Sequence, residues 1–189
     1  AAGTAVATAT AADVYLALAR DLDFWDGALD DALFALVRAT ADATHSGRCG
    51  LWRIDGTADA PILHVLVLHD AAHPGRRDGI DIGERAYPTY LAALEGGRLI
   101  DAADAVHDPR TREFATGYLD VHGIGAMLDA TLRRSGRLWG VLCVEHVGPP
   151  RRWSDDDRRL VTSMADLAQQ RLAHEDLKRS EAAYRTLSG

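Results

Sequence analysis

Asparagine is absent from this chain of 189 residues, and lysine occurs once, at Lys178, beside 20 arginines. Alanine is abundant as well, so the composition indicates a coding bias and not a functional device. The absence of asparagine still has one consequence. Any binding or catalytic motif that requires this residue is excluded.

Cysteine is scarce too. The two cysteines, Cys49 and Cys143, lie in separate strand-like runs, and neither belongs to a CxxC pair. Such residues are most often free, buried thiols of a protein in a reducing compartment. We therefore expect free thiols and a cytoplasmic location. A disulfide between the two cysteines would require their strands to adjoin.

Long apolar runs are also missing. No run approaches the ~20 residues that cross a membrane, and the first residues, AAGTAVATATAAD, lack the basic leader of a signal peptide. The net charge of −7 disfavours nucleic acid and anionic membrane surfaces as partners. The hydrophobic content of 47% is ordinary for a globular protein, so the chain can bury a full core.

Hydrophobic periodicity divides the chain into helices and hairpins. Residues 1–12 are small and low in complexity, and we expect them to be loose. A polar, glycine-rich loop at 71–83 is long enough to be functional. The expected elements are a short helix capped by Asp13, a helix from its cap Asp23 to about His45, strands at 49–55 and 62–69, a short helix at 87–95, an edge strand at 98–101, a helix from Asp108 to about His122, a hairpin at 125–147 and a last helix from Asp155 to about Leu187.

The last helix is far longer than the ~11–12 residues of an average helix. Ser154 is its expected cap, and the acids that follow favour the positive end of the helix dipole. Two sets of residues recur at intervals of seven positions, which supports packing against a partner helix. They are Leu160, Leu167 and His174, and Ser163, Gln170, Leu177 and Tyr184.

The stretch 125–147, GAMLDATLRRSGRLWGVLCVEHV, carries the most informative pattern. Two strand-like runs flank a glycine-containing turn, and both are apolar at odd and even positions, so both faces should be covered. Two carboxylates, Asp129 and Glu145, interrupt this apolarity. A two-residue turn at Ser135-Gly136 would pair odd positions with even ones. A bulge or a three-residue turn is needed to put both carboxylates on one face.

The segment GRLWGVLCVEH resembles the fifth-strand pattern of bacterial GAF domains, and HVGPPRRWSDDDRRLVTSMADLAQQRL resembles the exit into their last helix. The resemblance covers roughly Asp23 to Glu175. It implies an α+β, GAF-like fold with a central antiparallel sheet of five to six strands, N- and C-terminal helices on one face, and ligand-pocket loops and short helices on the other. The closing LKRSEAAYRTL resembles the start of a PAS domain. The implied parts are a disordered N-terminus and short helix at 1–22, a GAF core at 23–153, a signalling helix at 154–176, and at 177–189 a linker to a following PAS domain.

The same resemblance implies a non-catalytic sensory domain of a bacterial signal-transduction protein. It would bind a small molecule, dimerise through its N- and C-terminal helices, and control a histidine kinase or a cyclic-di-GMP enzyme (a diguanylate cyclase or phosphodiesterase). The cofactor stays unknown. Covalent bilin is not expected, because the positions of the family's Cys-His pair hold Phe114 and Ala115. The family's cyclic-nucleotide signature needs asparagine, and the histidines do not converge on a haem or metal site.

Alignment with the family also implies which residues face the ligand. The expected binding residues are Trp52, Tyr118, Met127, Asp129, Thr131, Cys143 and Glu145, with Trp139 and Val141 on the same face and Tyr87 and Tyr90 packing the short helix over the pocket. A buried, unpaired carboxylate is costly, so Asp129 and Glu145 each need a partner or a raised pKa. They would accept hydrogen bonds from the N–H groups of a planar, nitrogenous ligand.

Two alternatives stay open. Arginine side chains or backbone N–H groups could satisfy both carboxylates internally, which would leave a structural dimerisation module with a vestigial pocket. The other is a thiol-dependent reductase with Cys143 as nucleophile. A catalytic thiolate needs a cation or a helix start to lower its pKa, and Glu145, two residues away, has the opposite effect.

Overall fold

The computed structural model describes residues 9–57, 60–82 and 87–187, so most of the segment expected to be loose lies outside it. At its centre is an antiparallel sheet of six strands, in the order β3-β2-β1-β6-β5-β4. The predicted α+β fold is confirmed. The strands are β1 (Arg48–Thr57), β2 (Ala60–Asp70), β3 (Asp81–Ile82), β4 (Leu99–Ala102), β5 (Ile124–Arg134) and β6 (Arg137–Val147).

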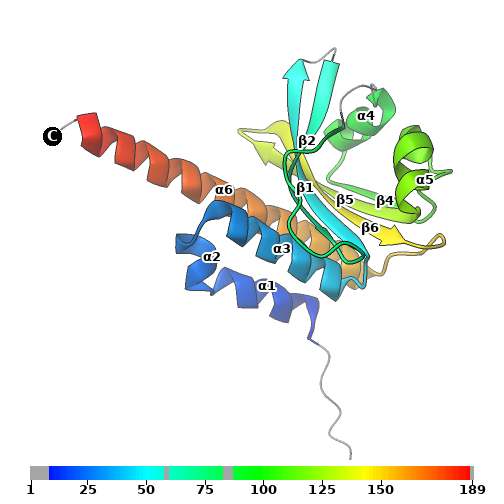
Figure 1. Ribbon diagram of the computed structural model, residues 1–189, viewed down its shortest axis with the longest axis horizontal. Coiled ribbons are helices and arrows are strands. Elements are labelled where there is room, and N and C mark those ends of the chain that lie inside the picture. The colour runs from blue at the N-terminus through cyan, green and yellow to red at the C-terminus, as the bar shows by residue number, and fades with distance from the viewer. Residues whose placement is uncertain (1–8, 58–59, 83–86, 188–189) are drawn as a thin grey trace, which may run out of the picture.

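Helices cover both faces of this sheet (Figure 1). The N-terminal helices and the long C-terminal helix pack together on one face, as predicted, and the shorter elements lie on the other. The first group is α1 (Ala11–Ala19), α2 (Leu22–Asp26), α3 (Leu29–Ala43) and α6 (Asp155–Leu187). The second group is α4 (Pro88–Gly96), the 3₁₀ turn η1 (Arg112–Phe114), the π-helical turn η2 (Ala115–Leu119) and α5 (Asp120–His122).

The first two helices begin earlier than predicted, and the second is interrupted. Thr10, not Asp13, caps α1, and the Asp13 carboxylate accepts from the Thr10 N–H at 2.9 Å, which makes a capping box. Asp21, not Asp23, caps α2. The predicted single helix from residue 23 to 45 is wrong. It is interrupted at Gly27, where a Cβ would lie 2.5 Å from the Asp23 carbonyl oxygen.

The predicted helix from Asp108 to His122 is also wrong. The segment forms three short turns, because Thr116 is extended and Gly117 has a φ of 93°, which a helix does not allow. Helix α4 and strand β4, by contrast, lie where the sequence predicted them. Pro88 occupies the first turn of α4, where its missing N–H costs no helical hydrogen bond.

The β5–β6 hairpin contains the bulge that the two carboxylates require. Its turn residues Ser135 and Gly136 have φ values of 48° and 78°, as a two-residue type I′ turn demands. The register then shifts, because Arg133 pairs with Leu138 and Leu132 with Gly140, so Trp139 is an extra residue in β6. Beyond the shift Asp129 lies opposite Cys143, and Met127 lies opposite Glu145. Odd positions of both strands therefore share the pocket face.

The same bulge makes the predicted orientation of Trp139 wrong. Its ring packs against the helix-side core, and the Arg134 guanidinium lies over it, 4.4 Å from the ring centroid. A residue inserted into a strand reverses the alternation of side chains. Trp139 therefore points away from the pocket although Val141 points into it.

The sheet separates two hydrophobic cores. The helix-side core includes Leu128 and Leu132 of β5, together with Leu142 of β6 and Leu160 of α6. The pocket-side core gathers aromatic and aliphatic residues from the sheet and the short helices. Since both faces of β5 and β6 are covered, their sequences are apolar at both parities. Among the described residues, no helix has the length and apolarity to span a membrane.

Truncation of Leu142, which is 0% exposed, tests the helix-side core. We expect Leu142→Ala to lower the free energy of unfolding by about 2–5 kcal/mol, because the vacated volume is enclosed on all sides. Urea unfolding followed by circular dichroism measures the change. The control is Leu177→Ala on α6, where Leu177 is 58% exposed, and its effect should stay within about 0.5 kcal/mol. Equal losses in both variants would contradict this account of the core.

Candidate functional site

The pocket-side core encloses a cavity of about 20 Å³. Such a volume holds about one water molecule, whereas small-molecule sites usually measure about 300–1,000 Å³. The protein's own side chains therefore fill the pocket in this conformation. The lining residues are Trp52, Leu63, Ile82, Tyr90, Phe114, Tyr118, Met127, Val141, Cys143 and Glu145.

Most of the predicted binding residues come together at this cavity. Trp52, Tyr118, Met127, Cys143 and Glu145 line it. Asp129 is fully buried on the same face of the sheet and is hydrogen-bonded to the lining residue Tyr90. Thr131 does not line the cavity. Its N–H donates to the Arg98 carbonyl oxygen beside β4, at 3.0 Å.

Glu145 is satisfied from within the chain by a residue that sequence reasoning missed. The Arg48 Nε donates to Glu145 Oε2 at 2.8 Å, and the Tyr118 hydroxyl donates to Glu145 Oε1 at 2.7 Å. Both charged side chains are nearly inaccessible, at 4% and 2% exposed. Burial alone would lower the pKa of Arg48, but the charges of Glu145 and Tyr118 and the hydrogen bonds with both residues together outweigh it and raise the pKa.

Arg48 also holds a second carboxylate. Its Nη1 donates to Asp70 Oδ2 at 2.6 Å, and His73 Nδ1 lies 3.2 Å from the same oxygen. Burial opposes ionisation of Asp70, but the hydrogen bond with His73 and the charge of Arg48 outweigh it and lower the Asp70 pKa. Arg48 thus joins the first residue of β1 to the last residue of β2 and to β6.

Asp129 has a different environment, without a cation. The Tyr90 hydroxyl donates to its Oδ2 at 2.7 Å and lies 3.6 Å from Cys143 Sγ. The Oδ1 atom is buried and has no hydrogen-bond partner among the described residues. Burial, helped by the charge of Glu145, raises the Asp129 pKa to about 8, although the Tyr90 hydrogen bond works against the shift. At neutral pH the side chain is therefore mainly a neutral carboxylic acid.

Cys143 is poorly suited to nucleophilic chemistry. It is 5% exposed, and burial and the neighbouring carboxylates raise its thiol pKa well above the ordinary value. Cys49 and Cys143 are both free. Because a thiolate is the reactive form of cysteine, a raised pKa suppresses the chemistry that a thiol-dependent reductase needs.

Helix α4 and segment 112–119, together called the lid, close the cavity as one unit. The Glu113 carboxylate accepts from the backbone N–H groups of Thr89 and Tyr90, at 3.1 and 3.0 Å, and so caps the start of α4. The rings of Tyr87 and Phe114 stack with centroids 4.1 Å apart. The two halves of the lid are thus bonded to each other as well as to the sheet.

Two tyrosine–carboxylate hydrogen bonds fasten the lid to the sheet. Tyr90 of α4 donates to Asp129 of β5, and Tyr118 of η2 donates to Glu145 of β6. The sequence predicted that Tyr90 packs over the pocket, but its bond to Asp129 is long-range and had no local signal. Arg48 did have a local signal in the sequence, since it is a charged residue at the start of a strand-like run.

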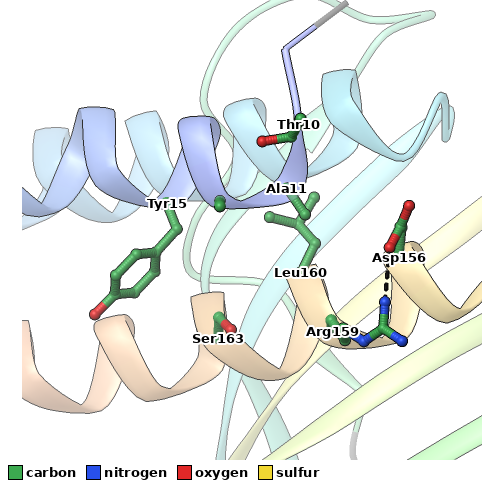
Figure 2. A pocket seen from close by; sticks show the side chains of 8 residues that line it. Thr10, Ala11, Tyr15, Asp156, Arg159, Leu160 and Ser163 are labelled. Carbon is green, nitrogen blue, oxygen red and sulfur yellow. Dashed lines mark hydrogen bonds and ion pairs between the residues drawn. The ribbon is translucent and has the colours of Figure 1, made fainter.

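A larger hollow of about 470 Å³ lies on the helix side of the sheet, between α1 and α6. Figure 2 shows α1 and the first turns of α6 facing each other across it, with Tyr15 on one wall and Leu160 and Ser163 on the other. An ion pair between Asp156 and Arg159, 2.9 Å long, borders it. This groove therefore lies between the terminal helices expected to dimerise.

Comparisons with known proteins agree on the fold. The sequence profile of the GAF domain family matches residues 28–172. A GAF domain of a phosphoenolpyruvate-protein phosphotransferase from Coxiella burnetii is 15% identical over 92% of this chain and 99% of its own, with a TM-score of 0.64. The blue-light absorbing form of the Thermosynechococcus elongatus PixJ GAF domain is 20% identical over 89% and 97%, with a TM-score of 0.66. Free methionine-R-sulfoxide reductase from Neisseria meningitidis, in complex with its substrate, is 12% identical over 89% of each chain, with a TM-score of 0.61. No curated protein matches this chain.

The position at which the family resemblance places the cysteine of a covalent bilin holds Phe114, whose ring stacks on Tyr87 in the lid. Within the described ranges, no group of three or more His, Cys, Asp or Glu side chains is placed to hold a metal ion.

The raised pKa of Asp129 predicts a pH-dependent stability. Between its ordinary pKa of 3.8 and its native pKa of about 8, the folded state holds a proton that the unfolded state releases. Stability must then fall as pH rises through this window, by at most about 1.4 kcal/mol per pH unit. Asp129→Asn should flatten the decline in urea-unfolding free energy relative to wild type. The exposed control Asp26→Asn should keep it, and an unchanged slope in Asp129→Asn would contradict the protonated state.

The Arg48 ion pairs predict a large stability loss and a partial rescue. Arg48→Met leaves two buried carboxylates without a cation and should cost roughly 3–5 kcal/mol of unfolding free energy. The double variant Arg48→Met, Glu145→Gln removes one uncompensated charge and should be more stable than Arg48→Met. Arg159→Met, which breaks an ion pair 71% and 81% exposed, should change stability by less than about 1 kcal/mol. A double variant less stable than the single one would refute the ion-pair account.

Proposed function

The chain belongs to the GAF domain family, and we propose that it is a sensory module that binds a small molecule in the pocket-side core. GAF domains are a regulatory and sensory family. The observation that carries the proposal is the pair of lid bonds, Tyr90 to Asp129 and Tyr118 to Glu145. Each is a hydrogen bond to a buried carboxylate that a ligand N–H group can replace.

The lining determines the chemistry of the ligand. Two acceptor carboxylates favour a molecule with at least two N–H groups, and the rings of Trp52, Phe114 and Tyr118 favour a flat, aromatic one. A cationic N–H group would bind the ionised form of Asp129, so the protein would release a proton on binding. Because the Asp129 pKa is about 8, the affinity for such a ligand should rise with pH up to that value.

Binding requires the lid to open, since the closed cavity holds about one water. The ligand would favour an open lid by replacing the two tyrosine hydrogen bonds with its own, which gives the two conformations different affinities. Asp129 and Glu145 remain fixed on the sheet while Tyr90 and Tyr118 move away. The remaining predicted contacts, Met127, Thr131 and Cys143, would then border the widened site.

Dimerisation through the N- and C-terminal helices would carry the pocket state to a partner chain. Leu160 and Leu167, which the heptad pattern assigned to a dimer, are instead buried in the chain's own core. An exposed stripe lies farther along α6, where five exposed residues alternate at spacings of four and three, as in a coiled coil. They are Ala173, Leu177, Ser180, Tyr184 and Leu187.

We assign the module to a cytoplasmic bacterial signalling protein, in which segment 177–189 leads into a PAS domain. Its output would be a histidine kinase or a cyclic-di-GMP enzyme, either a diguanylate cyclase or a phosphodiesterase. This assignment rests on the sequence resemblance. The helical conformation of α6 up to Leu187 supports it, because a continuous helix can transmit a rotation or a shift.

The second candidate is a structural dimerisation module with a self-filled pocket. The small cavity and the internal pairing of Glu145 with Arg48 favour it. It differs from the first candidate in one respect. The lid of a structural module would have no ligand to replace its tyrosines.

Native mass spectrometry of the chain, after incubation with a small-molecule extract of the expression host, tests both candidates. We expect a dimer that retains a molecule of a few hundred daltons, because the two carboxylates can accept its N–H groups. Asp129→Asn and Glu145→Gln should both lose this mass, and the surface control Asp26→Asn should keep it. Tyr90→Phe should retain more, because one lid bond is gone. A dimer without added mass in all variants would favour the structural module.

A further inference from the structure

The lid and α6 lie on opposite faces of the sheet (Figure 1). Any change in the lid must therefore cross the sheet, or pass around it, before it reaches α6. One residue of β5, Arg133, has polar contacts on both sides. Its backbone lies at the register shift that the bulge at Trp139 produces.

The Arg133 side chain holds the C-terminal end of α4. Its Nη2 donates to the carbonyl oxygens of Leu94 and Glu95, at 3.3 and 2.6 Å, and its Nη1 lies 3.5 Å from the Glu95 carboxylate. Carbonyl groups in the last turn of a helix have no intrahelical partner, and a cation there stabilises the negative end of the dipole. The guanidinium therefore fixes the end of α4 opposite to the one that Glu113 caps.

The Arg133 backbone is bonded to α6. Its N–H donates to Gln169 Oε1. A second link lies one helical turn earlier, where Asp166 accepts from Arg98 at 2.6 Å, just before β4. That pair is 61% and 44% exposed, so it contributes little by itself. Asp166 and Gln169 lie on one side of α6, and of their partners Arg98 directly follows the C-cap of α4 while Arg133 contacts the end of that helix.

We propose that Arg133 is a positioning residue that couples the lid helix α4 to α6 through Gln169. The lid conformation would move the Arg133 side chain, and the Arg133 N–H would pass the change to α6 at Gln169. By the reciprocity of linked equilibria, a perturbation of α6 at this point must also change the lid. The use of this coupling in signalling rests on the proposed function. The coupling itself is a property of the fold and needs no ligand.

Hydrogen–deuterium exchange of the full chain, read by mass spectrometry, tests the coupling without a ligand. Gln169→Ala should speed exchange in α4 by about threefold or more, while segment 33–41 of α3 stays at the wild-type rate. The adjacent Gln170→Ala, on an exposed position, is the matched control and should leave α4 unchanged. Gln169→Glu restores an acceptor oxygen and should return α4 to the wild-type rate, whereas Gln169→Met restores the side-chain bulk without the acceptor and should not, a difference that a loss of packing alone would not explain.

The reverse experiment uses Arg133→Met, which keeps the apolar stem and the backbone N–H. It should speed exchange in α6 near residues 166–173 as well as in α4. Wild-type exchange in α4 of Gln169→Ala would overturn the proposal, and so would an equal increase in all segments, 33–41 included. Absence of a retained small molecule would refute the sensory function but would leave these exchange results standing.

Discussion

The ion pairs of Arg48 determine the electrostatics of the whole pocket. A buried carboxylate needs a cation, a set of hydrogen-bond donors or a proton. One guanidinium satisfies Glu145 and Asp70 together, and with them it joins β1, β2 and β6. Asp129 is left without a cation, so it keeps a proton and a tyrosine partner. Of the two carboxyl groups on this face, only Glu145 is paired with a cation, because a single arginine reaches only one of them.

This asymmetry gives the two lid bonds different characters. The Tyr118 bond joins a charged network that includes Arg48, with the guanidinium Nη2 3.4 Å from the tyrosine oxygen. The Tyr90 bond reaches an isolated acid whose second oxygen has no partner in the described part of the chain. Because the Asp129 carboxyl changes charge with pH, the bond that fastens α4 depends directly on pH, whereas the bond that fastens segment 112–119 involves Arg48. The lid is therefore one unit mechanically but two units chemically.

The fold could be predicted from the sequence mainly because local residue patterns indicate its strands and helices. Apolar runs separated by turn residues gave the strands and the β5–β6 hairpin, and the long amphipathic pattern gave α6. The caps at Thr10 and Asp21 and the break at Gly27 were missed, since they depend on single backbone hydrogen bonds. Five of the seven predicted site residues line the cavity. The pairing of Arg48 and of Glu113 with their partners could not be predicted, because each lies 20 or more positions from the groups it binds.

Trp139 sets a limit on how this sequence can evolve. Its insertion into β6 is the reason why Asp129 and Glu145 share a face of the sheet. Loss of this one residue would shift the register and turn the odd positions of one strand into the helix-side core. Substitutions in β5 and β6 can accumulate gradually, but a deletion there would bury a charged carboxylate among leucines. The hairpin should therefore vary in composition across descendants of this sequence while its length stays fixed.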